Sequence, residues 1–155
     1  MKILMVCLGN ICRSPLAEGI LQQKVATHNL NWVVESAGTN GFHVGEAPHK
    51  FSQKVAKKYG VDISKQISRQ FFATDFDNFD KIYVMAKDVL DDVKKIAGNK
   101  FDENKIDYFL NELNENTNEN VPDPWYGNED GYEIVYKLID NTCDAIIKNF
   151  KASKK

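Results

Sequence analysis

The sequence predicts an α/β fold, a single doubly wound domain in which helices flank a parallel sheet. Two patterns carry this prediction. Short apolar runs, typical of buried parallel strands, occur at residues 3–6, 31–38, 80–85 and 106–110. Apolar residues recur at helical spacing between and after these runs, at 16–25, 49–59, 89–96 and 135–150. Strands that alternate with helices are joined by crossovers, which produce parallel neighbours in a sheet.

The first strand leads through a loop, residues 7–15, into the first helix, whose apolar pattern begins at Leu16. Ser14 is the expected N-cap, because its hydroxyl can accept a backbone hydrogen bond there. Pro15 is the expected first helical residue, because its ring already fixes a helical φ. A loop before a helix N-terminus offers unpaired N–H groups and the positive end of a dipole, which suit an anion.

The second strand is expected to end near Ser36, at the sheet edge where open α/β folds bind their ligands. A helix should begin at about His49 and end at Gly60, and the next helix should end at Gly98. Glycine is the usual residue after a helix because it adopts the left-handed conformation at little cost.

The polar stretches 61–72 and 111–120 lack periodicity, and we expect loops there. The last helix should begin near Glu129 or Asp130. The Lys-rich residues 151–155 are expected to be disordered, since chain ends without apolar anchors fray.

Composition argues against several classes of protein. The chain has 155 residues, and no repeat or linker divides residues 1–155. A net charge of -2 gives no indication of nucleic-acid binding. We expect no membrane span and no signal peptide, because the apolar runs are short. Three cysteines without a Cys-x-x-Cys pair, and three scattered histidines, favour the reducing cytoplasm and argue against a bound metal.

The loop after the first strand contains a thiol, Cys7, and a guanidinium, Arg13. A cysteine beside N–H donors at a helix N-terminus ionises readily, and the thiolate is a nucleophile at neutral pH. The planar fork of arginine matches two oxygens of a phosphate. The loop therefore predicts a cup that holds a phosphoryl group against sulfur. The expected reaction transfers phosphorus to Cys7 and then hydrolyses the intermediate.

Each feature of this loop has a simpler explanation when it is taken alone. A cysteine at the end of a strand is often only a small buried residue, and a Gly-Asn pair is often only a turn. The combination is more specific, because Cys7 and Arg13 flank a short segment with Gly9 and Asn10, between a strand and a helix. This combination favours a catalytic site.

Asp123 is the expected second chemical group. Hydrolysis of a phosphate ester requires a proton for the leaving oxygen and a base for the attacking water. Asp123 lies between Pro122 and Pro124, which restrict the backbone on both sides of the carboxyl group. Trp125 and Tyr126 follow and are suited to form an aromatic wall. An isolated Pro-Asp-Pro is more often a stiff turn, but beside a thiolate–arginine loop it predicts a general acid and base.

The chain resembles a low-molecular-weight protein tyrosine phosphatase over nearly its whole length. The matching segments are 7–15 (CLGNICRSP), 36–39 (SAGT), 68–70 (SRQ) and 123–127 (DPWYG). The first and the last are highly specific in this order and at this separation. The resemblance implies a four-stranded parallel sheet and a hydrolase, without a cofactor, that acts on phosphotyrosine in proteins and on aryl phosphates. Phosphate and other oxyanions are the implied ligands.

The resemblance also implies residue roles. Cys7 is the nucleophile, Arg13 binds the phosphate and Asp123 is the general acid. Ser14 hydrogen-bonds the thiolate, and Cys12 pairs reversibly with Cys7 under redox control. The implied phosphate-binding loop comprises Leu8, Gly9, Asn10, Ile11, Cys12 and Ser14, with Asn10 and Ser36 as braces. The implied walls of the aryl pocket are Ile11, Phe42, Trp125 and Tyr126.

The chain departs from the family pattern at two positions. Gln66 stands where many members have a histidine, so the resemblance does not imply a His-supported network in this chain. Ala86 follows Met85 where many members have Met-Asp, which removes a carboxylate often found near the site.

Three alternatives remain open. Arsenate reductases share the fold but use a further cysteine pair, whereas here the remaining cysteine is Cys143 in the last helix. Protein-arginine phosphatases have a threonine in place of Ile11 and a less aromatic wall after Asp-Pro. A non-catalytic phosphate-binding module would be expected to lack Cys7 or Asp123.

Overall fold

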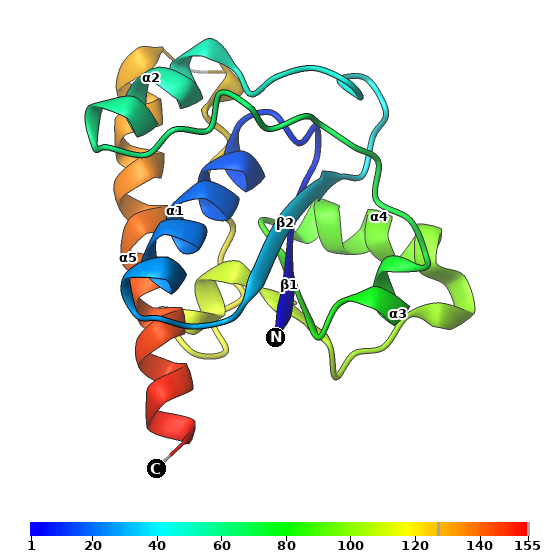
Figure 1. Ribbon diagram of the computed structural model, residues 1–155. Helices are drawn as coiled ribbons and strands as arrows, with labels where there is room; N and C mark the ends of the chain where they lie inside the picture. Colours follow the sequence, from blue (N-terminus) through cyan, green and yellow to red (C-terminus); the bar gives the residue numbers. More distant parts are fainter. Residues whose placement is uncertain (127, 155) are drawn as a thin grey trace.

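The computed structural model describes residues 1–126 and 128–154, except for the side chain of Tyr126 (Figure 1). Its sheet has four parallel strands in the order β2-β1-β3-β4. The strands are β1 (Lys2–Cys7), β2 (Val33–Gly38), β3 (Lys81–Val84) and β4 (Ile106–Tyr108). This confirms the predicted four-stranded parallel sheet. Strand β1 pairs with β2 on one side and with β3 on the other, so the chain first moves from β1 to β2 and then crosses back over β1 to β3. Such a switch of direction opens a crevice at the carboxyl ends of the strands.

Helices cover both faces of the sheet (Figure 1). One face carries α1 (Arg13–Thr27) and α5 (Glu129–Ser153), with α2 (Lys50–Lys58) packed beside them. The other face carries α3 (Asp75–Asn78) and α4 (Lys87–Ala97). Among the described residues, none of the helices combines the length and apolar character that crossing a bilayer requires.

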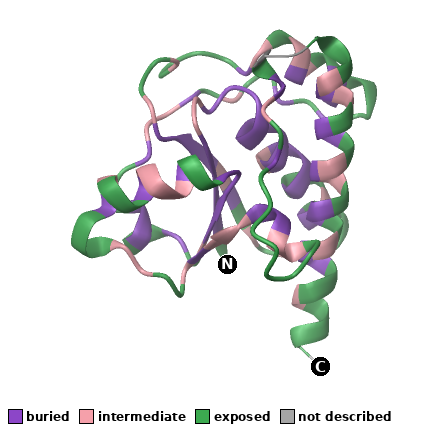
Figure 2. Ribbon diagram, turned by 180° about the vertical axis from the view of Figure 1, so that it is seen from behind, coloured by how far each residue is buried: buried purple, intermediate pink, exposed green. Residues whose placement is uncertain are grey.

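The alternation of side chains along β1 divides the core into two parts and aims Cys7. Ile3, Met5 and Cys7 belong to the core beneath α1 and α5, whereas Leu4 and Val6 belong to the core beneath α3 and α4. Successive residues of a strand point to opposite faces. Figure 2 shows the resulting buried strands between helices that are exposed on their outer sides. Cys7 therefore enters the site from the α1 side of the sheet.

Several boundaries differ from the expectation. The predicted strand 106–110 ends at Tyr108, and Phe109 and Leu110 begin a 3₁₀ turn that ends at Glu112. Both apolar side chains are buried in the same core, and neighbours in a strand would have faced opposite sides. The short helix α3 was not predicted, because its polar sequence offers no periodicity.

The expected disorder of residues 151–155 is also wrong in its described part. Helix α5 continues to Ser153, and Lys154 is its C-cap. Phe150 stacks edge-to-face on Trp32, with 4.7 Å between ring centroids, and this contact anchors the last turns of the helix. Lys155 lies outside the described residues.

Candidate active site

The loop between β1 and α1 curls around the Cys7 thiol. Its carbonyl groups are bound from outside: Cys7 and Leu8 accept N–H donors of Thr39 and Asn40, and Ile11 accepts from the His49 N–H. Two serine hydroxyl groups donate to two more carbonyls: Ser68 to that of Gly9, and Ser52 to that of Cys12. Since the C=O and N–H groups of a trans peptide point in opposite directions, the N–H groups are left to face the interior of the loop. The loop therefore presents donors to an anion.

Close packing against β2 holds this curl in place. Asn10 has φ 57°, in the left-handed region that asparagine tolerates better than most residues. Gly38, the last residue of β2, lies directly behind the loop. A Cβ at Gly38 would lie 2.9 Å from the Leu8 carbonyl oxygen and 3.0 Å from the Asn10 nitrogen. The curl thus requires glycine at this position.

Hydrogen bonds determine the orientation of the Asn10 amide. Its Oδ1 accepts from the Arg69 backbone N–H at 3.0 Å, which turns Nδ2 toward two serines. Nδ2 donates to Ser14 Oγ at 2.8 Å and to Ser36 Oγ at 2.9 Å. Ser36 in turn donates to Glu18 Oε1 at 2.7 Å. Burial, partly offset by the Ser36 hydroxyl, raises the pKa of Glu18.

The same network directs a proton toward the sulfur. Ser14 Oγ lies 3.0 Å from Cys7 Sγ and already accepts from Asn10, so its own O–H is free to donate to the sulfur. The Asn10 backbone N–H also donates to Cys7 Sγ, at 3.2 Å. Two donors, the Ser14 hydroxyl and the Asn10 backbone N–H, therefore point at one sulfur.

Ser14 is not the N-cap that we expected. Helix α1 begins at Arg13 with Cys12 as its N-cap, and Ser14 is the second helical residue. Its hydroxyl is fully buried and engaged with Asn10 and Cys7. The hydroxyl therefore serves the thiol and does not cap the helix.

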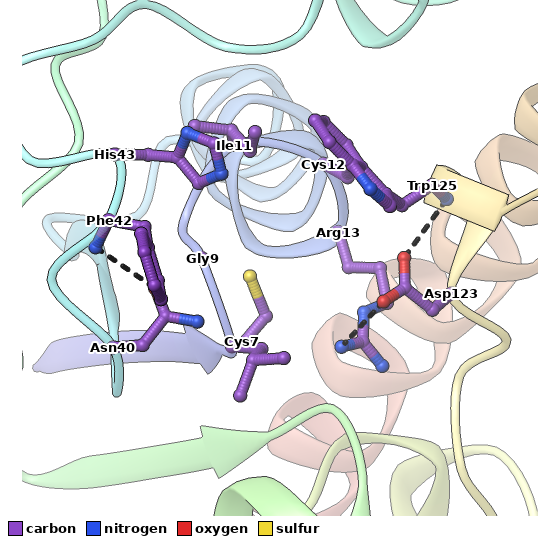
Figure 3. Close-up of a pocket in the computed structure, with 11 residues that line it drawn as sticks. Cys7, Gly9, Ile11, Cys12, Arg13, Asn40, Phe42, His43, Asp123 and Trp125 are labelled. Atoms are coloured by element: carbon purple, nitrogen blue, oxygen red, sulfur yellow. Dashed lines mark hydrogen bonds and ion pairs between the residues drawn. The ribbon is translucent and has the colours of Figure 1, made fainter.

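Arg13 lies beside Cys7 and is held by contacts with Val121 and Asp123, which are distant in the sequence. Its guanidinium, only 4% exposed, donates through Nη1 to the Val121 carbonyl at 3.0 Å. Nη2 lies 3.7 Å from Asp123 Oδ2. The other carboxylate oxygen of Asp123 accepts the Trp125 backbone N–H at 3.0 Å. The arginine and the carboxylate therefore lie side by side on one side of the cup, opposite Phe42 (Figure 3).

These groups line one pocket of about 150 Å³ (Figure 3). The predicted residues that line it are Cys7, Leu8, Gly9, Ile11, Cys12, Arg13, Phe42, Asp123 and Trp125. Asn10, Ser14 and Ser36 are not among its lining residues, and they brace the loop through the contacts described above. The side chain of Tyr126 and all of Gly127 lie outside the described residues.

Sequence reasoning missed two residues of this pocket, Asn40 and His43. His43 and His49 flank the Trp125 ring, with centroids 5.6 and 5.3 Å away. Burial, followed by the nearby Lys50 and His43 charges, lowers the pKa of His49. The adjacency of His43 to Phe42 was the available signal, but its approach to Trp125 depends on tertiary packing.

Cys12 also lines the pocket, but it is a buried thiol with a raised pKa. It is 5% exposed, its Sγ lies 3.5 Å from the Tyr132 hydroxyl, and burial raises its pKa to about 11. Cys7 and Cys12 are both free thiols. Cys143 is fully buried in α5, where burial raises its pKa strongly.

Gln66 and Ala86, the two residues that depart from the family pattern, each make local contacts in the structure. Gln66 Nε2 donates to the Pro15 carbonyl at 3.0 Å and so ties the irregular segment to the first turn of α1. Its Oε1 is buried without a hydrogen-bond partner among the described residues. Ala86 is buried and is the N-cap of α4.

Comparisons with known proteins agree with this architecture. The family model described as "Low molecular weight phosphotyrosine protein phosphatase" matches residues 2–155. The chain is 39% identical over 144 residues to the low molecular weight protein-tyrosine-phosphatase PtpA of Staphylococcus saprophyticus, covering 92% of this chain and 88% of that protein.

Two solved structures extend the similarity to three dimensions. A protein tyrosine phosphatase from Entamoeba histolytica, crystallised with Hepes in its active site, has a TM-score of 0.88 at 33% identity and covers 100% of this chain and 99% of its own. A Drosophila arginine phosphatase has a TM-score of 0.88 at 31% identity. The similarity covers 97% of this chain and 98% of that chain. Together with the family model, these matches show that the chain belongs to the low molecular weight phosphotyrosine protein phosphatases.

Proposed function

We propose that this chain hydrolyses phosphotyrosine in proteins, and aryl phosphates generally, through a cysteinyl-phosphate intermediate. It belongs to a family of phosphoric monoester hydrolases, so phosphatase activity is the starting point. The observation that carries the proposal is the Cys7 sulfur, which two donors approach in the pocket that Arg13 and Asp123 also line.

In the first step, the Cys7 thiolate attacks phosphorus and the bond to the aryl oxygen breaks. The Arg13 fork and the inward N–H groups stabilise the charge on the transferring oxygens. Asp123 gives its proton to the leaving oxygen.

In the second step, Asp123 takes a proton from water. The oxygen of that water attacks phosphorus, the phosphorus–sulfur bond breaks, and the Cys7 thiolate is restored with release of phosphate. One carboxyl group at the mouth can serve both steps, because the leaving oxygen and the water occupy the same position in turn.

An aryl ester suits the pocket above the sulfur. Ile11, Phe42 and Trp125 give it apolar walls, which fit a flat ring. The arginine phosphatase relative keeps the alternative substrate class open. Ile11 and the aromatic wall favour phosphotyrosine over phosphoarginine. Arsenate reduction is disfavoured because Cys143 is buried within α5, away from the cup.

The substitution Cys7→Ser tests the mechanism. A serine hydroxyl is barely ionised at this site, so turnover should fall below detection while the fold and phosphate binding persist. In the wild type, acid quenching during turnover should trap phosphate on Cys7, and mass spectrometry would locate it. Full turnover by the serine variant would refute covalent catalysis.

We also propose reversible redox control by Cys12. Hydrogen peroxide oxidises the Cys7 thiolate to a sulfenic acid, and attack by the Cys12 sulfur then forms a disulfide and releases water. The raised pKa of Cys12 keeps it protonated at neutral pH, so the disulfide should form faster as the pH rises toward about 11.

The variant Cys12→Ser tests this control. After peroxide and then dithiothreitol, the wild type should regain activity, whereas the variant should lose it largely for good through over-oxidation of Cys7. The variant Cys143→Ser is the matched control and should recover like the wild type. Equal recovery of the wild type and Cys12→Ser would leave Cys12 as a packing residue.

The partners that follow from this activity are proteins that carry phosphotyrosine, with free phosphate and other oxyanions as ligands of the cup. We propose a cytoplasmic location on the ground that Cys7 must remain reduced to act.

A further inference from the structure

A second groove opens beside the catalytic pocket and extends beyond the groups that take part in the chemistry described above. Its volume is about 610 Å³, and it shares Leu8, Arg13 and Asp123 with the pocket that contains Cys7. In Figure 3, Arg13 and Asp123 lie on one side of that pocket and Phe42 lies on the other. The groove therefore continues from the phosphate site on the side away from Phe42.

The walls of this groove are held at a set separation. One wall is the start of α4, and the other is the segment 120–123. The Lys87 backbone N–H donates to Asn120 Oδ1 at 2.9 Å, and the Val121 N–H donates to the Met85 carbonyl at 2.7 Å. Ala86 lines the groove between these bonds, and its small side chain leaves the volume open.

The charges of the groove favour a cation. Apart from Arg13 and Asp123, its ionisable residues are Lys87, Asp88 and Asp91. Lys87 Nζ is paired with Asp91 Oδ2 at 3.0 Å, which compensates its charge. Asp88 is exposed and has no cationic partner within residues 1–126 and 128–154. Phosphate bound at Arg13 would make this end of the groove more negative still.

We propose that the groove binds a lysine or arginine side chain of the substrate protein, close in sequence to the phosphotyrosine. This inference rests on the proposed phosphotyrosine phosphatase function, because a phosphotyrosine bound at Arg13 brings the neighbouring substrate residues close to the groove, which shares Leu8, Arg13 and Asp123 with the pocket. Asp88 attracts the cationic group, and Pro122 offers an apolar surface to its methylene stem. Because the site is open to solvent, added salt weakens the preference.

Phosphotyrosine peptides that differ only in the flanking residues test the proposal, with lysine, glutamine or glutamate on each side in turn. For the wild type at low ionic strength, we expect kcat/KM to be about threefold higher with lysine than with glutamate, as an exposed ion pair allows. In Asp88→Lys this ratio should fall to about one or below. Because the ratio is taken within one enzyme, changes in folded fraction or catalytic rate cancel.

The matched control is Glu103→Lys, the same charge change at an exposed turn before β4, and it should keep the wild-type ratio. p-Nitrophenyl phosphate, which has no flanking residues, separates the two ways of failing. If neither it nor any peptide is hydrolysed, the proposed function fails. If it and all peptides are hydrolysed without a lysine preference, or with one that Asp88→Lys leaves unchanged, the groove assignment alone is overturned.

Discussion

At the scale of single residues, the position of Asp123 makes it the group whose role is most directly testable. One of its oxygens is held by the Trp125 N–H and the other faces Arg13. Asp123→Asn removes the proton donor and keeps the shape. We expect kcat/KM for phenyl phosphate, which reports the transfer step, to fall by about 10²–10⁴-fold, because phenolate is a poor leaving group. p-Nitrophenyl phosphate should lose much less.

The leaving-group series supplies its own control for this substitution. Plotting log kcat/KM against the acidity of the leaving phenol should give a steeper dependence for Asp123→Asn than for the wild type. Equal losses with all leaving groups would contradict the role of Asp123 as the acid and would leave it a structural partner of Arg13.

At the scale of elements, the junction of β2 with the loop after β1 decides the shape of the cup. Gly38→Ala would press a Cβ against the Leu8 carbonyl oxygen, 2.9 Å away, and against the backbone of Asn10. We expect a loss of about 1–3 kcal/mol in the free energy of unfolding, since backbone atoms must move. Activity of the folded protein should also fall, because the donors to Cys7 shift with the loop.

Gly131→Ala is the matched control for this prediction. Gly131 lies in α5, where a Cβ would meet nothing within 4 Å. Alanine is the better helix former, so this variant should gain about 0.5–1 kcal/mol in urea unfolding and keep its activity. A Gly38→Ala variant with wild-type stability and rate would show that the loop can adapt.

At the scale of the whole molecule, the core beneath α1 and α5 sets the stability of the fold. Ile139 is fully buried in this core, within α5. Ile139→Ala should lower the free energy of unfolding by about 2–5 kcal/mol, through lost burial and the remaining cavity. Ile134→Ala, at a residue of the same helix that is 66% exposed, should change it by less than about 0.5 kcal/mol. Chemical denaturation followed by circular dichroism would measure both.

The fold could be predicted because its signals are local. Short apolar runs placed the strands and helical periodicity placed the main helices, and Gly60 and Gly98, both with positive φ, ended two helices as expected. The sequence patterns did not predict the structure where the apolar residues follow neither a strand period nor a helix period. Phe109 and Leu110 form a 3₁₀ turn in place of a strand end, and α3 carries too little pattern to be seen.

The sequence by itself determined that Cys7 and Arg13 share one loop between a strand and a helix, because a few residues of chain keep them together whatever the rest does. Only the tertiary structure decided which distant groups reach that loop. Val121 holds Arg13, Arg69 and Ser36 orient Asn10, and two histidines flank Trp125. These contacts join segments far apart in the chain. Their geometry depends on how the helices pack on the sheet, which no local periodicity specifies.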